Sequence, residues 1–274
     1  MSGPSVPSVT ERRFRPAAHG RREAGARILS LLILLWVAAG PVYAGDVKVA
    51  VTSSFLETMN AIAEEFQKAT GHRVLLNEAT TGELYAQILN EAPFDVFLAG
   101  DDIDPKNLED DGFAVRGSIF TYAVGRLTLW SQDPRGVGPD GVAMLRAGQF
   151  GHLVIANPLT SANGQAAVQA LKALGVWEAI QGKVLEAQSS RQAFQWVASG
   201  KARLGLVPLA EVLDPDLKDK GSRWDIPVSL YTPIRQDAVL LIRGQSNPAA
   251  VALMGYLRTS SVRAIMDQFG FGLP

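Results

Sequence analysis

The sequence predicts an α/β fold with largely parallel sheets. Short β-rich runs alternate along the chain with stretches in which apolar residues recur at helical spacing. The chain has 274 residues, 47% of them apolar and 19% charged, so it can bury a full core in one or two domains. Ligands of such sheets bind beyond the carboxyl ends of the strands, and a site is expected there.

The predicted elements follow one another as strand, helix, strand. Strands are predicted at 47–51, 73–76, 95–99, 153–156, 183–186 and 204–207. Helices are predicted at 56–66, 83–90, 165–174, 192–199, 248–258 and 261–269. Two long extended stretches, 118–131 and 226–243, interrupt the alternation. We interpret them as a double crossover between two lobes, with residues 45–123 and 237–274 in the first and 124–236 in the second, although a single large sheet would give a similar pattern.

Residues 1–44 predict a signal peptide for secretion. Six arginines between Arg12 and Arg27 precede an apolar run at 28–39, and Pro41 and small residues up to Ala44 follow it. The run has 12 residues, whereas a membrane-spanning helix needs roughly 20. We therefore expect cleavage after Ala44 and a periplasmic protein.

Charge and cysteine content narrow the possible functions. The chain has no cysteine, which excludes disulfides, thiolate metal sites and cysteine nucleophiles. Loss of the first 44 residues removes six arginines and two acids and changes the formal charge from −1 to −5. Nucleic acid and anionic membranes are therefore not expected as partners, because binding to phosphates needs clustered Lys and Arg. We expect a soluble monomer.

Four predicted strand-to-helix junctions share hydroxyl side chains or a flexible glycine. They are Thr52-Ser53-Ser54, Thr80-Thr81-Gly82, Thr160-Ser161-Ala162-Asn163-Gly164 and Ser189-Ser190. Such residues are common helix caps, and Ser54 with Glu57 and Ser189 with Gln192 fit the spacing of a capping box. A helix N-terminus also exposes free N–H groups and about half a positive charge, so several of them at one cleft would bind an anion.

The side chains around these junctions favour a fully ionised dianion. Hydrogen phosphate carries a proton that needs an acceptor, and the hydroxyl clusters contain no carboxylate. We interpret Glu57 as a cap partner and Glu78 as a solvated charge at a strand end. Arg191 directly follows Ser190, and it is either an exposed arginine at a helix start or a cation that adds to the anion site.

Segments spread along the chain after residue 44 match one known family. They are Val49–Phe55, Ala79–Tyr85, Ala92–Phe97, Asn157-Pro158 with Gly164, Pro233–Ala238 and Phe269–Pro274. On these segments the chain resembles the periplasmic molybdate-binding proteins of ABC importers. The resemblance implies a two-lobed type II periplasmic binding-protein fold with a double-crossover hinge, which closes on molybdate or tungstate and delivers it to an inner-membrane permease.

The resemblance also implies which residues bind the ligand. Donors are expected at Ser53, Ser54 and Thr81 in the first lobe, and at the backbone of Asn163 and Ser190 in the second. Asn163 stands where alanine or tyrosine is expected, but a backbone N–H would survive that exchange. At the position of Pro208 some members of the family have a tyrosine whose hydroxyl is a further donor, and this chain lacks it.

An enzyme is the main alternative, with Ser53 or Ser54 as the nucleophile. After residue 44 only His72 and His152 could act as a histidine base, and their positions in a turn and at a strand start suit structural or surface roles. The sequence has neither a G-x-S-x-G elbow nor a G-x-x-x-x-G-K-[ST] phosphate loop. A non-enzymatic protein is therefore expected.

A receptor for sulfate, for a carboxylate or for a bare metal ion in the same fold is the other alternative. Carboxylate capture normally uses a bidentate arginine, and only Arg191 lies near the junctions. A metal needs several converging ligands, and the acidic run Asp101-Asp102-Ile103-Asp104 better fits a solvated helix start next to Pro105. We expect neither a cofactor nor a bound metal cation.

Overall fold

The computed structural model describes residues 1–3, 5, 44–214 and 220–273. The chain divides into the units Met1–Tyr43 and Ala44–Pro274, and the second holds the described helices and strands. The signal peptide predicted for residues 1–44 lies outside the described residues, except for 1–3, 5 and 44. Within the described ranges no helix combines the length and the apolar character needed to cross a bilayer.

Five strands form the first sheet, in the order β2-β1-β3-β10-β4. They are β1 (Asp46–Thr52), β2 (Arg73–Ala79), β3 (Val96–Leu98), β4 (Phe120–Gly125) and β10 (Ile234–Leu240). β1 pairs in parallel with β2 and β3, whereas β10 runs antiparallel to β3 and β4. A strand from near the end of the chain therefore joins β3 to β4.

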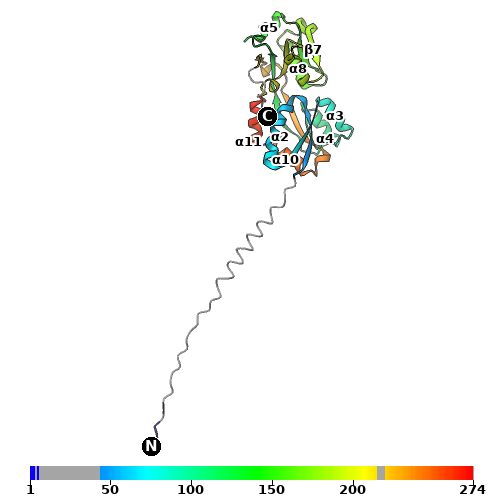
Figure 1. The fold of residues 1–274 in the computed structure, drawn as a ribbon. Coiled ribbons are helices and arrows are strands. Elements are labelled where there is room, and N and C mark those ends of the chain that lie inside the picture. Colours follow the sequence, from blue (N-terminus) through cyan, green and yellow to red (C-terminus); the bar gives the residue numbers. More distant parts are fainter. Residues whose placement is uncertain (4, 6–43, 215–219, 274) are drawn as a thin grey trace. The chain divides into compact units, whose positions relative to one another are not determined.

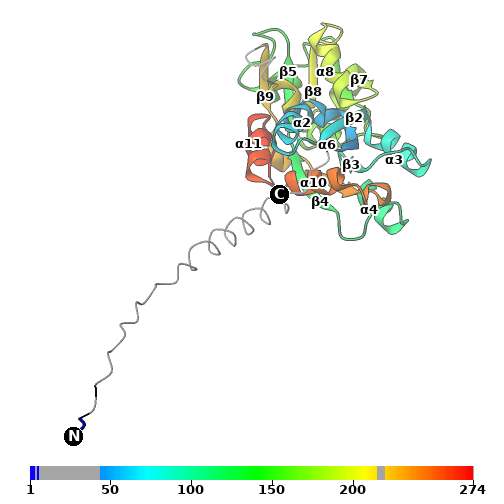
Figure 2. The same ribbon diagram turned by 60° about the horizontal axis from the view of Figure 1, so that its bottom comes forward.

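Helices cover both faces of the first sheet because its central strands are apolar on both sides. Val47, Val49 and Val51 of β1 pack in one core with α2 (Leu56–Thr70), and Ala50 packs in another with α3 (Thr81–Leu89). Figures 1 and 2 show these helices around the sheet, together with three more. The three are α4 (Asp104–Asp110), α10 (Pro248–Tyr256) and α11 (Ser260–Gln268), the last of which contacts α2.

The second sheet has the order β7-β6-β8-β5-β9. Its strands are β5 (Leu127–Ser131), β6 (Leu153–Ala156), β7 (Val184–Ala187), β8 (Leu204–Pro208) and β9 (Ser222–Asp225). β6 pairs in parallel with β7 and β8, and β5 runs antiparallel to β8 and β9. The accompanying helices are α5 (Gly141–Ala147), α6 (Ala162–Ala173), α7 (Trp177–Ile180), α8 (Ser190–Ala198) and α9 (Leu209–Val212).

The α/β fold is confirmed, but the sheets are mixed rather than largely parallel. Two of the four strand pairs in each sheet are antiparallel. β10 brings the chain back from the second sheet and therefore enters the first sheet against the direction of β3. The prediction of one extended stretch over 226–243 is wrong in part, because short 3-10 helices at Val228–Leu230 and Ile242–Gly244 flank β10.

The chain passes between the sheets at two places in the described residues. Only Arg126 separates β4 of the first sheet from β5 of the second, and residues 226–233 separate β9 from β10 on the return. Pro227 and Pro233 lie in the return segment, where they cannot donate to a strand ladder. The division into lobes at 123/124 and 236/237 stays a prediction.

Candidate functional site

Ser53 and Ser54 lie in the 3-10 helix η1 (Ser53–Phe55), directly after β1. Their exposed fractions are 3% and 5%. The predicted cap at Ser54 is wrong, because η1 delays α2 until Leu56 and no side chain caps either helix. The Oγ atom of Ser54 is buried without a hydrogen-bond partner in the described part of the chain. A buried hydroxyl without a partner is costly, so this group suits a ligand.

Two neighbouring threonines at the start of α3 have different partners. Thr80 caps the helix in a capping box: its N–H donates to Glu83 Oε2 at 3.0 Å, and the Glu83 N–H donates to Thr80 Oγ1 at 3.3 Å. Thr81 Oγ1 accepts from the Gly100 N–H at 3.1 Å and lies 3.2 Å from Thr52 Oγ1. If Thr52 donates in that contact, the proton of the Thr81 hydroxyl is free for a ligand.

In the second sheet, the starts of α6 and α8 lie together. Ser161, which precedes α6, has its Oγ 3.3 Å from Oγ of Ser190 at the start of α8. Asn163 and Ser190 are buried, and Oδ1 of Asn163 has no partner among the described residues. A Cβ at Gly164 would lie 2.3 Å from the carbonyl oxygen of Ala156, so α6 begins in close contact with the end of β6.

The predicted cap at Ser189 is confirmed. The Gln192 N–H donates to Ser189 Oγ at 3.1 Å. The reciprocal bond of a capping box goes instead to the preceding residue, because Gln192 Oε1 accepts from the N–H of Gln188 at 2.9 Å. Ser189 therefore stabilises α8 and leaves Ser190 to face the α6 start.

The structure connects all four junctions by contacts. The Thr52–Thr81 contact joins the end of β1 to the start of α3, and the Ser161–Ser190 contact joins the starts of α6 and α8. η1 contacts α8, which links the two pairs. The five predicted residues Ser53, Ser54, Thr81, Asn163 and Ser190 are all between 2% and 6% exposed. The arrangement offers hydroxyl and amide donors from both sheets.

Arg191 is neither an exposed residue nor a free cation. It lies in the first turn of α8 with a side chain that is 28% exposed, and it forms an ion pair with Glu57 of α2. The interpretation of Glu57 as a cap partner is therefore wrong. The 3-10 helix η1 moves the start of α2 to Leu56, and Glu57 forms its ion pair with Arg191 instead. Glu78 is exposed, as expected.

A second carboxyl group, not predicted from the sequence, lies beside Arg191. Glu211 of α9 is 5% exposed, and its Oε2 lies 3.9 Å from Arg191 Nη1. Burial raises the pKa of Glu211 to about 8, although the positive charge of Arg191 acts in the opposite direction. Nothing in the sequence around Glu211 indicates its burial, which follows from the short turn of helix after Pro208.

Other residues considered from the sequence are either structural or exposed. His72 is buried, its Nδ1 accepts from the Gly45 N–H at 3.0 Å, and its ring stacks on Phe66. His152 is exposed. Asp101 accepts from two N–H groups at the start of α4, which confirms the helix-start interpretation. The described ranges contain no group of three or more His, Cys, Asp or Glu placed to hold a metal ion.

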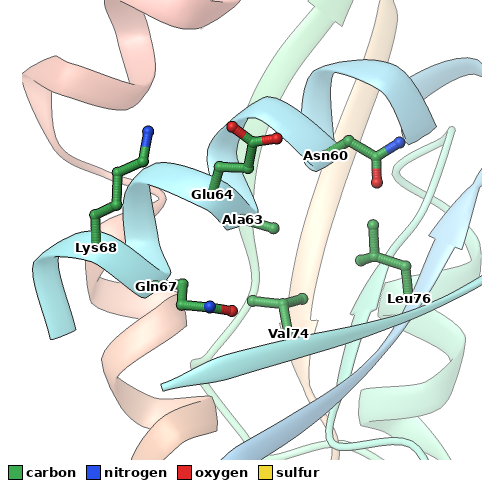
Figure 3. Close-up of a pocket in the computed structure, with 7 residues that line it drawn as sticks. All are labelled: Asn60, Ala63, Glu64, Gln67, Lys68, Val74 and Leu76. Carbon is green, nitrogen blue, oxygen red and sulfur yellow. The ribbon is translucent and has the colours of Figure 1, made fainter. Parts of the chain in front are cut away.

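A hollow of about 750 Å³ lies away from the five predicted residues. Figure 3 shows that side chains of α2 and β2 line it, and none of the five is among them. The lining residues are Asn60, Ala63, Glu64, Gln67, Lys68, Val74 and Leu76. A smaller cavity of about 150 Å³ lies between 101–103, α6 and 232–235.

Comparisons with known proteins place the chain in a family. Residues 47–272 match the family described as bacterial extracellular solute-binding protein. The molybdate-binding protein ModA of Azotobacter vinelandii is 48% identical over 230 residues, which cover 84% of this chain and 91% of that protein. The ModA protein of Rhodobacter capsulatus is 40% identical over 248 residues, which cover 90% and 95%.

A solved structure agrees with the sequence comparison. The periplasmic molybdate-binding protein of Azotobacter vinelandii superposes with a TM-score of 0.78 at 38% identity, over 83% of this chain and 99% of that chain. The periplasmic binding-protein fold implied by the resemblance is thereby confirmed. The chain belongs to the bacterial extracellular solute-binding protein family, and within it to the periplasmic molybdate-binding proteins.

Proposed function

We propose that this protein captures molybdate, and also tungstate, in the periplasm and delivers the anion to the inner-membrane permease of an ABC importer. We propose further that it acts as a monomer and catalyses no reaction. The buried hydroxyl of Ser54, which has no hydrogen-bond partner among the described residues, carries the proposal, because it lies in η1, which contacts α8. The relatives named above as molybdate-binding proteins support the choice of ligand.

The donors proposed for the ligand are neutral. They are the side chains of Ser53, Ser54 and Thr81 and the backbone N–H groups of Asn163 and Ser190. A dianion such as molybdate only accepts hydrogen bonds, and each bond to a charged acceptor contributes roughly 1.5 to 3 kcal/mol. About five of them suffice for micromolar to nanomolar affinity after the cost of association.

The ion pair between Arg191 and Glu57 supports a site that depends on dipoles rather than on a free cation. Because Glu57 already balances the charge of Arg191, the anion gains little from that guanidinium. Helix starts and hydroxyls then replace the hydration of the ligand. Pro208 offers no hydroxyl, so all the proposed donors come from the four junctions.

Calorimetry of the secreted protein with molybdate, tungstate, sulfate and phosphate tests the proposal. We expect tight 1:1 binding of molybdate and tungstate, and weak or no binding of the smaller sulfate and of phosphate. Heat with sulfate alone would support a sulfate receptor instead. If none of the four anions binds, the oxyanion proposal is wrong, and turnover of a simple ester would then support the hydrolase alternative.

A further inference from the structure

The ion pair of Arg191 joins helices that pack on different sheets. Arg191 is the second residue of α8, which packs on β6 and β8 of the second sheet. Glu57 is the second residue of α2, which packs on β1 and β2 of the first sheet. The two residues are 134 positions apart in the sequence. Their contact therefore fixes the distance between the start of α2 on the first sheet and the start of α8 on the second.

The environment of Arg191 is more enclosed than that of the other ion pairs. The side chains of Arg191 and Glu57 are 28% and 31% exposed, whereas those of Arg73 and Asp46 are 61% and 46% exposed. Glu211 adds a nearly buried carboxyl group 3.9 Å from Nη1 of Arg191. Nη1 of Arg191 and Oε1 of Glu211 have no hydrogen-bond partner in the described ranges. A partly desolvated pair resists solvent screening better than an exposed one.

The pair lies next to the proposed ligand donors. Ser190, whose N–H is one of them, directly precedes Arg191, and η1 with Ser53 and Ser54 directly precedes α2. A shift at the Arg191–Glu57 contact therefore moves donors of both sheets relative to each other. Small displacements of such donors weaken charge-assisted hydrogen bonds steeply.

We propose that Arg191 is a positioning residue for the anion site: by bridging from α8 to Glu57, with Glu211 behind it, it holds the donors of the two sheets at binding distance. The proposal rests on the proposed function. In it Arg191 does not contact the ligand. The bridge must break when the two groups of donors separate, so it slows the release of the anion.

The sign of one charge change distinguishes this role from direct binding of the anion by Arg191. Glu57→Gln removes a negative charge near the ligand and frees the guanidinium. By electrostatics alone, or with Arg191 as a ligand, this variant binds a dianion more tightly. A positioning role gives the opposite result, because the bridge is lost.

The experiment compares variants of the secreted protein by calorimetry with molybdate and by the rate of molybdate dissociation. We expect Glu57→Gln to weaken binding about 10-fold, mainly through faster dissociation. Arg191→Met should weaken it similarly, and the double variant should bind no more weakly than Arg191→Met alone, because the two residues act as one unit. Asp46→Asn breaks an exposed ion pair within the first sheet and should leave binding unchanged.

Each outcome decides the proposal. Equal or tighter binding by Glu57→Gln overturns it, as does additivity of the two single changes. Arg191→Lys keeps the charge but offers one ammonium to two carboxyl groups, so we expect an intermediate dissociation rate; a rate equal to that of the unchanged protein overturns the proposal even if Glu57→Gln fails to fold. Absence of molybdate binding by the unchanged protein contradicts the proposed function itself, and is thus distinguishable.

Discussion

At the scale of single residues, Thr80 and Thr81 show how adjacent side chains of one type take different roles. Thr80 closes a capping box, which is a local structure that the sequence spacing reveals. The Thr81 hydroxyl reaches across to Thr52 and Gly100, residues far away in the sequence. A resemblance to a family indicated Thr81, whereas its neighbours could come only from the fold.

Thr81→Ala should weaken molybdate binding by about 1 to 3 kcal/mol, because it removes a donor to a buried charge. The matched control is Thr80→Ala, which should lower the free energy of unfolding by about 1 kcal/mol through loss of the cap. Calorimetry and urea unfolding measure the two effects. An unchanged dissociation constant for Thr81→Ala would remove this residue from the site.

Glu211 makes stability depend on pH in an unusual direction for a carboxyl group. Because burial raises its pKa to about 8 from 4.5, the folded protein keeps a proton that the unfolded chain loses between these values. The stabilisation is complete below about pH 4.5 and is lost as pH rises through 8. The free energy of unfolding should therefore fall by about 5 kcal/mol across this range from Glu211 alone.

Glu211→Gln replaces the acid by a neutral amide and should remove most of that dependence. Urea unfolding at pH 5, 7 and 9 measures it, since Gln cannot lose a proton. Glu64→Gln, on the exposed face of α2, is the control and should leave the dependence intact. Identical pH profiles for Glu211→Gln and the unchanged protein would mean that Glu211 titrates normally.

At the scale of elements, helices and strands were predictable because their patterns are local. Apolar spacing placed β1, β6 and α2 close to their observed bounds. The η1 turn was not predicted, since three residues carry too little periodicity, and this omission also caused the wrong cap at Ser54. The ion pair of Arg191 with Glu57 depends on packing between distant segments, which no local pattern contains.

The start of α6 depends on a close approach that only glycine permits. Gly164→Ala would place a methyl group 2.3 Å from the carbonyl oxygen of Ala156. Because that oxygen belongs to the backbone, the overlap can be relieved only by a backbone shift. We expect a loss of about 2 kcal/mol or more in stability and weaker molybdate binding, because the Asn163 N–H moves with the helix.

Gly255 provides the control for this change. It lies in α10 with no atom within 4 Å of a built Cβ. Gly255→Ala should therefore raise the free energy of unfolding by about 0.5 to 1 kcal/mol through its higher helix propensity. Equal effects of the two substitutions in urea unfolding would show that the contact with Ala156 is not limiting.

At the scale of the whole molecule, the mixed sheets explain what alternation of elements could not predict. Successive strand–helix–strand units account for the three parallel strands in each sheet. The antiparallel strands are β10 and β5, and each is the first strand after the chain passes from one sheet to the other. Their direction depends on how the chain enters the sheet. Pairing over such sequence distances is a property of topology rather than of composition.

The position of β10 also has a consequence for synthesis. β3 and β4 do not pair with each other, and the strand that joins them ends at Leu240. A growing polypeptide on the ribosome thus cannot complete this sheet until nearly the whole chain has been translated. The first sheet therefore folds only after its last strand has been synthesised, and it remains incomplete until then.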